Sequence, residues 1–104
     1  LSKENVEWGK VKLGLVDERF VDQKSEYSNE RHIKNNLVKN CAKTAILSSM
    51  VCCIDNESLN LEMVSNSYSC FIERTDFTLL GMGNDGHTAS IFPNDKESNE
   101  LMNE

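Results

Sequence analysis

The sequence predicts an α/β fold built on a parallel sheet. Residues 11–16 and 76–80 are largely apolar runs next to charged or glycine-rich segments, as strands buried on both faces of such a sheet are. Between them, two stretches carry apolar residues at helical spacing. This alternation predicts part of a doubly wound, Rossmann-like parallel sheet with flanking helices, because the strands available are few for a complete sheet.

Charged residues follow the first predicted strand directly. Asp17, Glu18 and Arg19 stand at the strand end where open α/β sheets bind their ligands. The planar fork of Arg19 suits a phosphate, and Asp17 could orient a hydroxyl, a water molecule or an imidazole. Alternatively, these residues are no more than a solvated strand end.

A helix is predicted over residues 29–44, with Ser28 as its N-cap. Asn29 could add a neutral hydrogen bond to a ligand at the same strand end, or belong only to the helix start. The helix carries one apolar stripe, formed by Ile33, Leu37, Val38, Cys41 and Ala42. We expect this stripe to pack on the sheet.

The second half of the chain predicts a further helix. Residues 50–54 could form a strand, although so short an apolar run does not separate a strand from a helix. Asp55 or Asn56 can cap a helix that ends near residue 74. Its apolar stripe consists of Leu61, Val64, Tyr68, Phe71 and Ile72. The acidic residues 94–104 either fray or begin another helix.

The composition is that of one small acidic protein. A chain of 104 residues supports a single core, so we expect one α/β domain over residues 1–104. The net charge of −6 argues against a nucleic-acid partner, and no apolar run is long enough to cross a membrane. The four cysteines form neither a C-x-x-C motif nor a zinc cluster with the two histidines. We therefore expect no metal, reduced thiols and a cytosolic location.

The segment of residues 79–93 is the most informative part of the chain. It contains three glycines that let the backbone turn tightly and leave its amides accessible: Gly81, Gly83 and Gly86. Asp85 and His87 flank the last glycine, so a turn can present both side chains to one cleft. Residues 88–90 could then open a helix.

Two common phosphate motifs do not fit this loop. Asp85 stands where a dinucleotide fingerprint approaches the pyrophosphate, and no Gly-Lys-Ser/Thr closes a Walker loop. Exposed amides beside an aspartate and a histidine suit the polarisation of a carbonyl with proton transfer, in hydrolysis or in isomerisation. In the plainer alternative, the glycines only form a turn and His87 is solvated.

The two predicted strand ends would meet in one crevice. If the strands are neighbours in a parallel sheet, their carboxyl ends lie at the same edge. Asp17 and Arg19 after the first strand would then face Asp85 and His87 after the last.

These segments together resemble the 6-phosphogluconolactonases, in the larger group of glucosamine-6-phosphate isomerases and deaminases. The resemblance covers the chain from about residue 6 to residue 93, and its last stretch is highly specific. It rests on Trp8 followed by Leu15-Val16-Asp17-Glu18-Arg19-Phe20-Val21, on Ser28-Asn29, and on Asp76-Phe77 with Leu80-Gly81-Met82-Gly83-Asn84-Asp85-Gly86-His87-Thr88-Ala89-Ser90-Ile91-Phe92-Pro93.

The resemblance implies an activity and a set of roles. Members of this family open the ring ester of 6-phosphoglucono-1,5-lactone with water in the pentose phosphate pathway, and they require no metal or nucleotide. The resemblance implies that His87 is the acid or base, with Asp85 beside it, and that the glycine loop shapes the pocket. Arg19 would hold the phosphate or orient the substrate, and Asp17 would have an orienting role. The implied partner is a phosphorylated sugar lactone.

Two other functions stay open at this point. The related deaminases carry a glutamate directly before the loop proline, where this chain has Phe92 before Pro93, and the difference favours the lactonase. The same kind of fold could also bind sugar phosphates without catalysis.

The resemblance also concerns the extent of the chain. Members of the family are longer, with a G-G-S/T-x-P phosphate loop upstream and further strands downstream. We therefore expect an internal fragment, the central part of a larger lactonase domain, whose activity alone is an open question. Its exposed sheet edges could lead to self-association.

Overall fold

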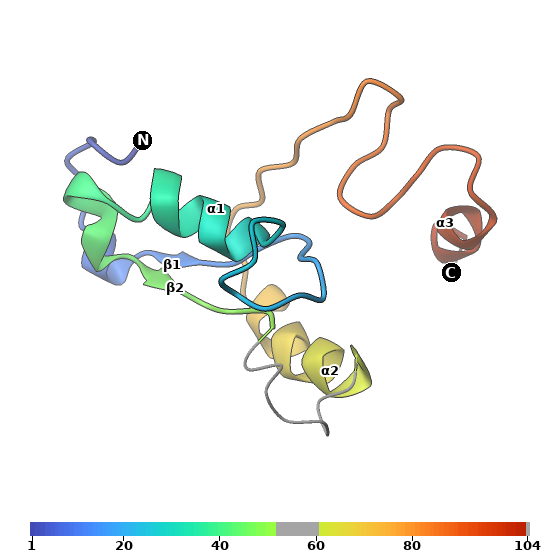
Figure 1. The fold of residues 1–104 in the computed structure, drawn as a ribbon, viewed down its shortest axis with the longest axis horizontal. Helices are drawn as coiled ribbons and strands as arrows, with labels where there is room; N and C mark the ends of the chain where they lie inside the picture. The colour runs from blue at the N-terminus through green and yellow to red at the C-terminus, as the bar shows by residue number, and fades with distance from the viewer. Residues whose placement is uncertain (52–60, 104) are drawn as a thin grey trace.

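The computed structural model describes residues 1–51 and 61–103. Figure 1 shows two short strands, with α1 and α2 on either side of the chain that continues from them. The segment after α2 runs away from this part toward α3. In chain order the elements are η1 (Trp8–Lys10), β1 (Lys12–Leu13), α1 (Asn29–Asn36), η2 (Asn40–Thr44), β2 (Ile46–Leu47), α2 (Leu61–Ile72) and α3 (Lys96–Leu101), where η denotes a 3-10 helix.

The two strands are parallel, as the sequence predicts for this fold class. Lys12 lies opposite Ile46, and Leu13 lies opposite Leu47. Only these two residues of the predicted strand over 11–16 are in the ladder, so that prediction is right in place and too long. The α/β class with a parallel sheet and flanking helices is confirmed.

The second strand lies earlier than predicted. β2 pairs with β1 at Ile46–Leu47, because the backbone N–H of Ile46 donates to the carbonyl of Val11 at 2.9 Å. The N–H of Ser48 donates to Leu13 at the same distance. The strand predicted over residues 50–54 is therefore wrong at residues 50 and 51, and the rest of it lies outside the described residues.

Helix α1 begins where predicted and ends early. The Ser28 hydroxyl accepts a hydrogen bond from the backbone N–H of Arg31, which confirms the N-cap. The helix stops at Asn36, and the backbone is extended at Lys39 before Asn40 takes a left-handed φ of 54°, a conformation that asparagine tolerates better than most residues. A 3-10 turn, η2, replaces the predicted last turns. Cys41 is consequently exposed, which corrects its place in the buried stripe, whereas Ala42 is buried.

Helix α2 packs against the chain just after β1. The buried hydroxyl of Tyr68 accepts the backbone N–H of Leu15 at 2.6 Å. A Cβ atom on Gly14 would collide with the ring of Phe71, so a glycine permits this close approach. Val64 and Tyr68 of the predicted stripe are buried, but its two ends, Leu61 and Ile72, are exposed. The predicted caps of this helix, Asp55 and Asn56, lie outside the described residues.

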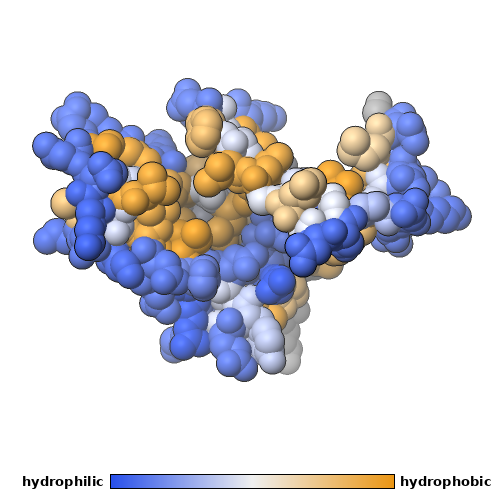
Figure 2. Space-filling view, turned by 90° about the horizontal axis from the view of Figure 1, so that it is seen from above, coloured by the Kyte–Doolittle hydropathy of each residue, from blue (hydrophilic) through white to orange (hydrophobic). Residues whose placement is uncertain are grey.

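The predicted strand over residues 76–80 is not formed in the described part of the chain. The segment pairs with neither β1 nor β2, and a strand needs a ladder partner to exist. Its side chains are exposed, with 80% of Phe77 and 74% of Leu79 accessible. Figure 2 shows apolar side chains gathered over a hollowed face of the molecule. The apolar side chains of residues 76–80, which the sequence predicts to be buried, are thus exposed in the structure.

Among the residues that the structure describes, the apolar core is correspondingly small. Its buried residues are Trp8, Ala42, Val51, Val64 and Tyr68. Glu30 is also buried, with 1% of its surface accessible, and its carboxylate accepts hydrogen bonds from Lys34 at 2.5 Å and from the Ser49 hydroxyl at 2.8 Å. This contact ties α1 to the segment after β2. Among the helices of the described residues, none has the length and apolar character to cross a membrane.

Candidate active site

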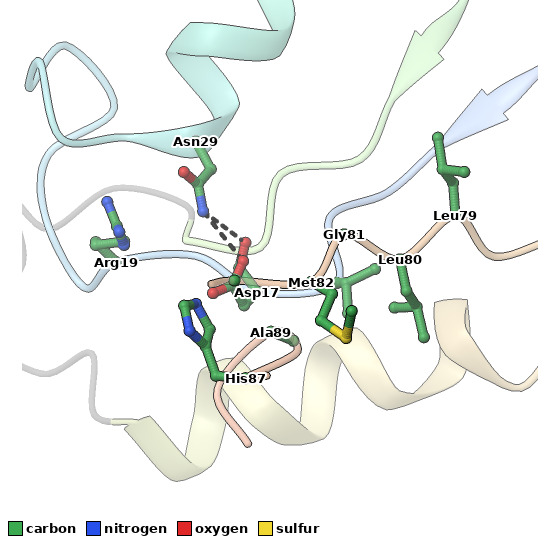
Figure 3. Close-up of a pocket in the computed structure, with 11 residues that line it drawn as sticks. Asp17, Arg19, Asn29, Leu79, Leu80, Gly81, Met82, His87 and Ala89 are labelled. Carbon is green, nitrogen blue, oxygen red and sulfur yellow. Dashed lines mark hydrogen bonds between the residues drawn. The ribbon is translucent and has the colours of Figure 1, made fainter. Parts of the chain in front are cut away.

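A cavity of about 440 Å³ opens beyond the carboxyl end of β1. Three parts of the chain build it: the residues after β1, the first residue of α1, and the glycine-rich loop (Figure 3). Its lining consists of Val16, Asp17, Arg19, Asn29, Leu79, Leu80, Gly81, Met82, Gly83, His87 and Ala89. Segments far apart in the sequence thus meet at one strand end.

Asp17 is held by the side chain of Asn29. The amide Nδ2 of Asn29 donates to Oδ1 of Asp17 at 3.1 Å and to its backbone carbonyl at 3.2 Å. Figure 3 shows both bonds, with the imidazole of His87 near the same carboxylate. Asn29 therefore fixes the plane of a carboxylate that faces the cavity.

Arg19 lies at the rim of the cavity and is largely exposed. Its Nη1 donates to the backbone carbonyl of Tyr27 at 3.1 Å, which anchors one edge of the guanidinium. The fork carries further N–H groups that can bind an anion in bidentate fashion. The arrangement is suited to a phosphate or a carboxylate at the rim.

His87 and Asp85 form a hydrogen-bonded pair. Nδ1 of His87 lies 2.5 Å from Oδ1 of Asp85, and the backbone N–H of His87 donates to the same oxygen at 3.2 Å. The hydrogen bond from the imidazole, followed by that from the backbone, holds the pKa of Asp85 below its ordinary value. Because the ionised carboxylate only accepts, Nδ1 carries the proton of this hydrogen bond, which leaves the lone pair of the neutral imidazole on Nε2.

The glycines of the loop hold the backbone close to His87. The N–H of Gly83 donates to the carbonyl of His87 at 2.8 Å, and that of Gly86 to the carbonyl of Gly83 at 2.9 Å. Gly86 has a φ of 87°, which other residues rarely adopt. At Gly83 a Cβ atom would collide with the imidazole. The backbone is therefore wrapped closely around the histidine.

The residues after His87 form a turn, which corrects the helix start predicted at residues 88–90. Thr88 and Ile91 exchange backbone hydrogen bonds across an antiparallel bridge. Ala89 has a φ of 51°, so the chain reverses there. The turn brings Phe92 back onto the imidazole of His87, with ring centroids 4.8 Å apart. Sequence reasoning gave Phe92 no contact of this kind.

Glu18 is a second residue whose part in the site was not predicted. Its carboxylate accepts the backbone N–H groups of Arg19, Asn29 and Glu30 and the hydroxyl of Ser28, at 2.7 to 3.0 Å. Partial burial raises its pKa, but the backbone hydrogen bonds outweigh that effect and leave the pKa of Glu18 below its ordinary value. In the sequence Glu18 stands at the end of the predicted strand, ten residues ahead of Ser28, and nothing there indicated its bonds to the helix start.

The structure brings together most of the predicted site residues, with two exceptions. Asp17, Arg19, Asn29, Gly81, Gly83 and His87 all line the cavity. Asp85 instead lies against His87, and Gly86 lines a separate hollow of about 300 Å³ next to Phe92 and α3. Within residues 1–51 and 61–103, no group of three His, Cys, Asp or Glu side chains is arranged to hold a metal ion.

Fold and site together define a parallel α/β protein with a polar cavity at the carboxyl end of its strands. Residues 1–103 match the family of glucosamine-6-phosphate isomerases and 6-phosphogluconolactonase. The chain therefore belongs to this family. Over 102 residues it is 34% identical to a 6-phosphogluconolactonase of Rhizobium meliloti (strain 1021), which covers 98% of this chain and 44% of that protein.

Further relatives and two crystal structures agree with this assignment. A 6-phosphogluconolactonase of Helicobacter pylori (strain ATCC 700392 / 26695) is 32% identical over 104 residues, 44% of its length. The crystal structure of a 6-phosphogluconolactonase from Shewanella baltica OS155 superposes with a TM-score of 0.77 at 34% identity, over 95% of this chain and 42% of the other. A structure from Neisseria gonorrhoeae FA 1090 gives a TM-score of 0.81 at 35% identity, over 95% and 43%. The chain thus spans less than half the length of these relatives.

Proposed function

We propose that the protein containing this chain hydrolyses 6-phospho-D-glucono-1,5-lactone to 6-phosphogluconate. The observation that carries the proposal is the pairing of His87 with Asp85 at a cavity that also presents Asp17 and Arg19. The names of the relatives support the substrate, because they are called 6-phosphogluconolactonases. Residues 1–104 would be one α/β domain or the central part of a larger one.

In the proposed reaction His87 is the base and then the acid. Its Nε2 takes a proton from water as the water oxygen attacks the lactone carbonyl carbon. The bond from that carbon to the ring oxygen then breaks, and the ring oxygen receives the proton from the imidazolium. The product is an open-chain acid that loses its own proton to solvent. Asp85 stabilises the imidazolium that forms between the two steps.

The remaining cavity residues would position the substrate. Arg19 at the rim would bind the phosphate or another oxygen-rich end of the lactone through its fork. Asp17, oriented by Asn29, would accept a hydrogen bond from a sugar hydroxyl. The backbone of Gly81 and Gly83 would come close to the substrate because neither residue has a side chain.

A location in the cytosol is part of the proposal. Cys41 is a free, exposed thiol, and free thiols persist in a reducing compartment.

The proposal is tested with the complete protein in a pH-stat assay of lactone hydrolysis, with the uncatalysed rate subtracted. His87→Ala should lower kcat by about a hundredfold or more, which is the usual contribution of a general base. The matched control is His32→Ala, since His32 is the other histidine of the chain and lies exposed on α1. Near-normal kcat in His87→Ala would remove His87 from its proposed role.

A second assay separates catalysis from mere binding. If the protein only bound sugar phosphates, calorimetry would detect 6-phosphogluconate while the pH-stat recorded no acid release. The deaminase alternative would show as ammonia release from glucosamine 6-phosphate. We expect acid release from the lactone and no ammonia, because Phe92 stacks on His87 where the related deaminases carry a glutamate.

A further inference from the structure

Glu18 does not line the cavity, but its carboxylate binds two residues that do. Its Oε1 accepts the backbone N–H of Arg19 at 2.8 Å and the backbone N–H of Asn29 at 2.7 Å. Arg19 and Asn29 both line the cavity, and Glu18 does not. A single oxygen atom therefore bridges the two ends of the loop over residues 19–29.

The other oxygen completes the attachment to helix α1. Oε2 accepts the backbone N–H of Glu30 at 2.7 Å and the hydroxyl of Ser28 at 3.0 Å. These groups lie at the N-terminus of α1, where unpaired N–H groups and the helix dipole favour a carboxylate. The contact fixes the start of α1 relative to the strand end that carries Asp17.

The consequence reaches the cavity through Asn29. With its backbone N–H held by Glu18, the side chain of Asn29 reaches Oδ1 of Asp17 at 3.1 Å. Asp17 and Arg19 are the two chain neighbours of Glu18, so all three polar residues on this side of the cavity are placed relative to one carboxylate. Small displacements of such groups are costly, because orientation of a substrate requires accuracy to within a fraction of an ångström.

We propose that Glu18 is a positioning residue for the lactone-opening reaction, which sets Asp17, Arg19 and Asn29 opposite His87 by bridging the strand end to α1. The expected effect on kinetics rests on the proposed function. The expected effect on the position of Asn29 rests on the hydrogen bonds alone. Glu18 itself touches neither the substrate nor the reacting atoms.

The alternative is that Glu18 only stabilises the start of the helix. Ser28→Ala provides the comparison, since it removes the hydroxyl that caps Arg31 and its one bond to Glu18, but leaves the backbone N–H groups of Asn29 and Arg19 bonded to the Glu18 carboxylate. Glu26→Gln is the charge-matched control, because Glu26 is an exposed acid in the same loop. Glu18→Gln removes the charge and presents an NH₂ group to the N–H donors, so it breaks part of the bridge.

The experiment measures kcat, KM and thermal unfolding of these variants in the complete protein. Glu18→Gln should lose about tenfold or more in kcat/KM, with KM raised, whereas Ser28→Ala should keep most of its activity at a comparable loss of Tm. Glu26→Gln should match the wild type in both measurements. Equal kinetic losses in Glu18→Gln and Ser28→Ala, at equal losses of Tm, would overturn the proposal.

A measurement independent of turnover separates this inference from the proposed function. The side-chain NH₂ signals of Asn29 in a ¹H–¹⁵N spectrum should shift in Glu18→Gln and stay in place in Glu26→Gln. If the wild type fails to hydrolyse the lactone but the signals shift as expected, the proposed function is wrong and the bridge stands. Unshifted Asn29 signals in a folded Glu18→Gln protein would refute the bridge whatever the activity.

Discussion

Nδ1 of His87 lies 2.5 Å from Oδ1 of Asp85, two residues earlier in the same loop. So short a separation in sequence is possible because Gly86 lies between them with a left-handed φ of 87°. The pair therefore comes from one turn and needs no distant element to assemble it. What the turn alone does not provide is the opposite wall of the cavity, which comes from Asp17, Arg19 and Asn29.

Asp85→Asn tests whether this pair sets the state of the imidazole. The asparagine amide can donate to Nδ1 and so favour the tautomer whose Nε2 already carries a proton, which cannot act as a base. We expect kcat for the lactone to fall by about ten- to a hundredfold, because the asparagine keeps the shape but not the charge. The measurement is steady-state hydrolysis in the pH-stat.

The control for Asp85→Asn is Asp76→Asn, an exposed aspartate ahead of the loop. Thermal unfolding should be nearly unchanged in both variants, because 59% of the Asp85 side chain is accessible. If Asp85→Asn lost Tm in parallel with kcat, the role of Asp85 would be structural and not the control of the imidazole tautomer.

Gly83→Ala tests the close contact of the loop with His87. A Cβ atom at residue 83 would collide with the imidazole, so the ring must move away from its place at the cavity. We expect a loss of about a hundredfold in kcat/KM, since a shift of this size misplaces the base. Gly9→Ala is the matched control, because a Cβ atom there meets no other atom within 4 Å. Wild-type kinetics in Gly83→Ala would show that the loop yields without moving the ring.

Local patterns predicted those parts of the fold that local interactions determine. The Ser28 cap and the turn at Gly86 depend on residues a few positions away, and both are found. Asp17, Arg19 and His87 line one cavity as expected. The premise behind that expectation is wrong for residues 76–80, because the rule on parallel strand ends assumed that this segment is a strand, and it pairs with neither β1 nor β2.

The mistakes concern interactions that periodicity does not encode. Helix α1 ends at Asn36 within an otherwise continuous apolar stripe, and the backbone is extended at Lys39 before the left-handed Asn40. The segment 76–80 has the composition of a buried strand, but a strand also needs a neighbour, and this segment pairs with neither β1 nor β2. Glu18 was overlooked because its hydrogen bonds to Asn29 and Glu30 cross a loop that the sequence shows only as polar.

The acid stability of the protein provides a last prediction about Glu18. Its pKa in the folded protein lies below the ordinary value of 4.5, since the backbone hydrogen bonds from Glu30, Asn29 and Arg19 outweigh the effect of burial. A carboxyl whose pKa is lowered by folding stabilises the folded state fully above its unfolded pKa. That contribution is lost as the pH falls through the lower, folded pKa.

The difference in unfolding free energy between wild type and Glu18→Gln should therefore be largest near neutral pH and shrink below about pH 4.5. Asp85 and Asp95 also have lowered pKa values, but both proteins share them, so their effect cancels in the difference. Urea titrations at a series of pH values measure this quantity in the complete protein. A difference that stayed constant from neutral to acidic pH would mean that the Glu18 charge adds nothing to the bridge, and that only the shape of the side chain holds Arg19 and Asn29 in place.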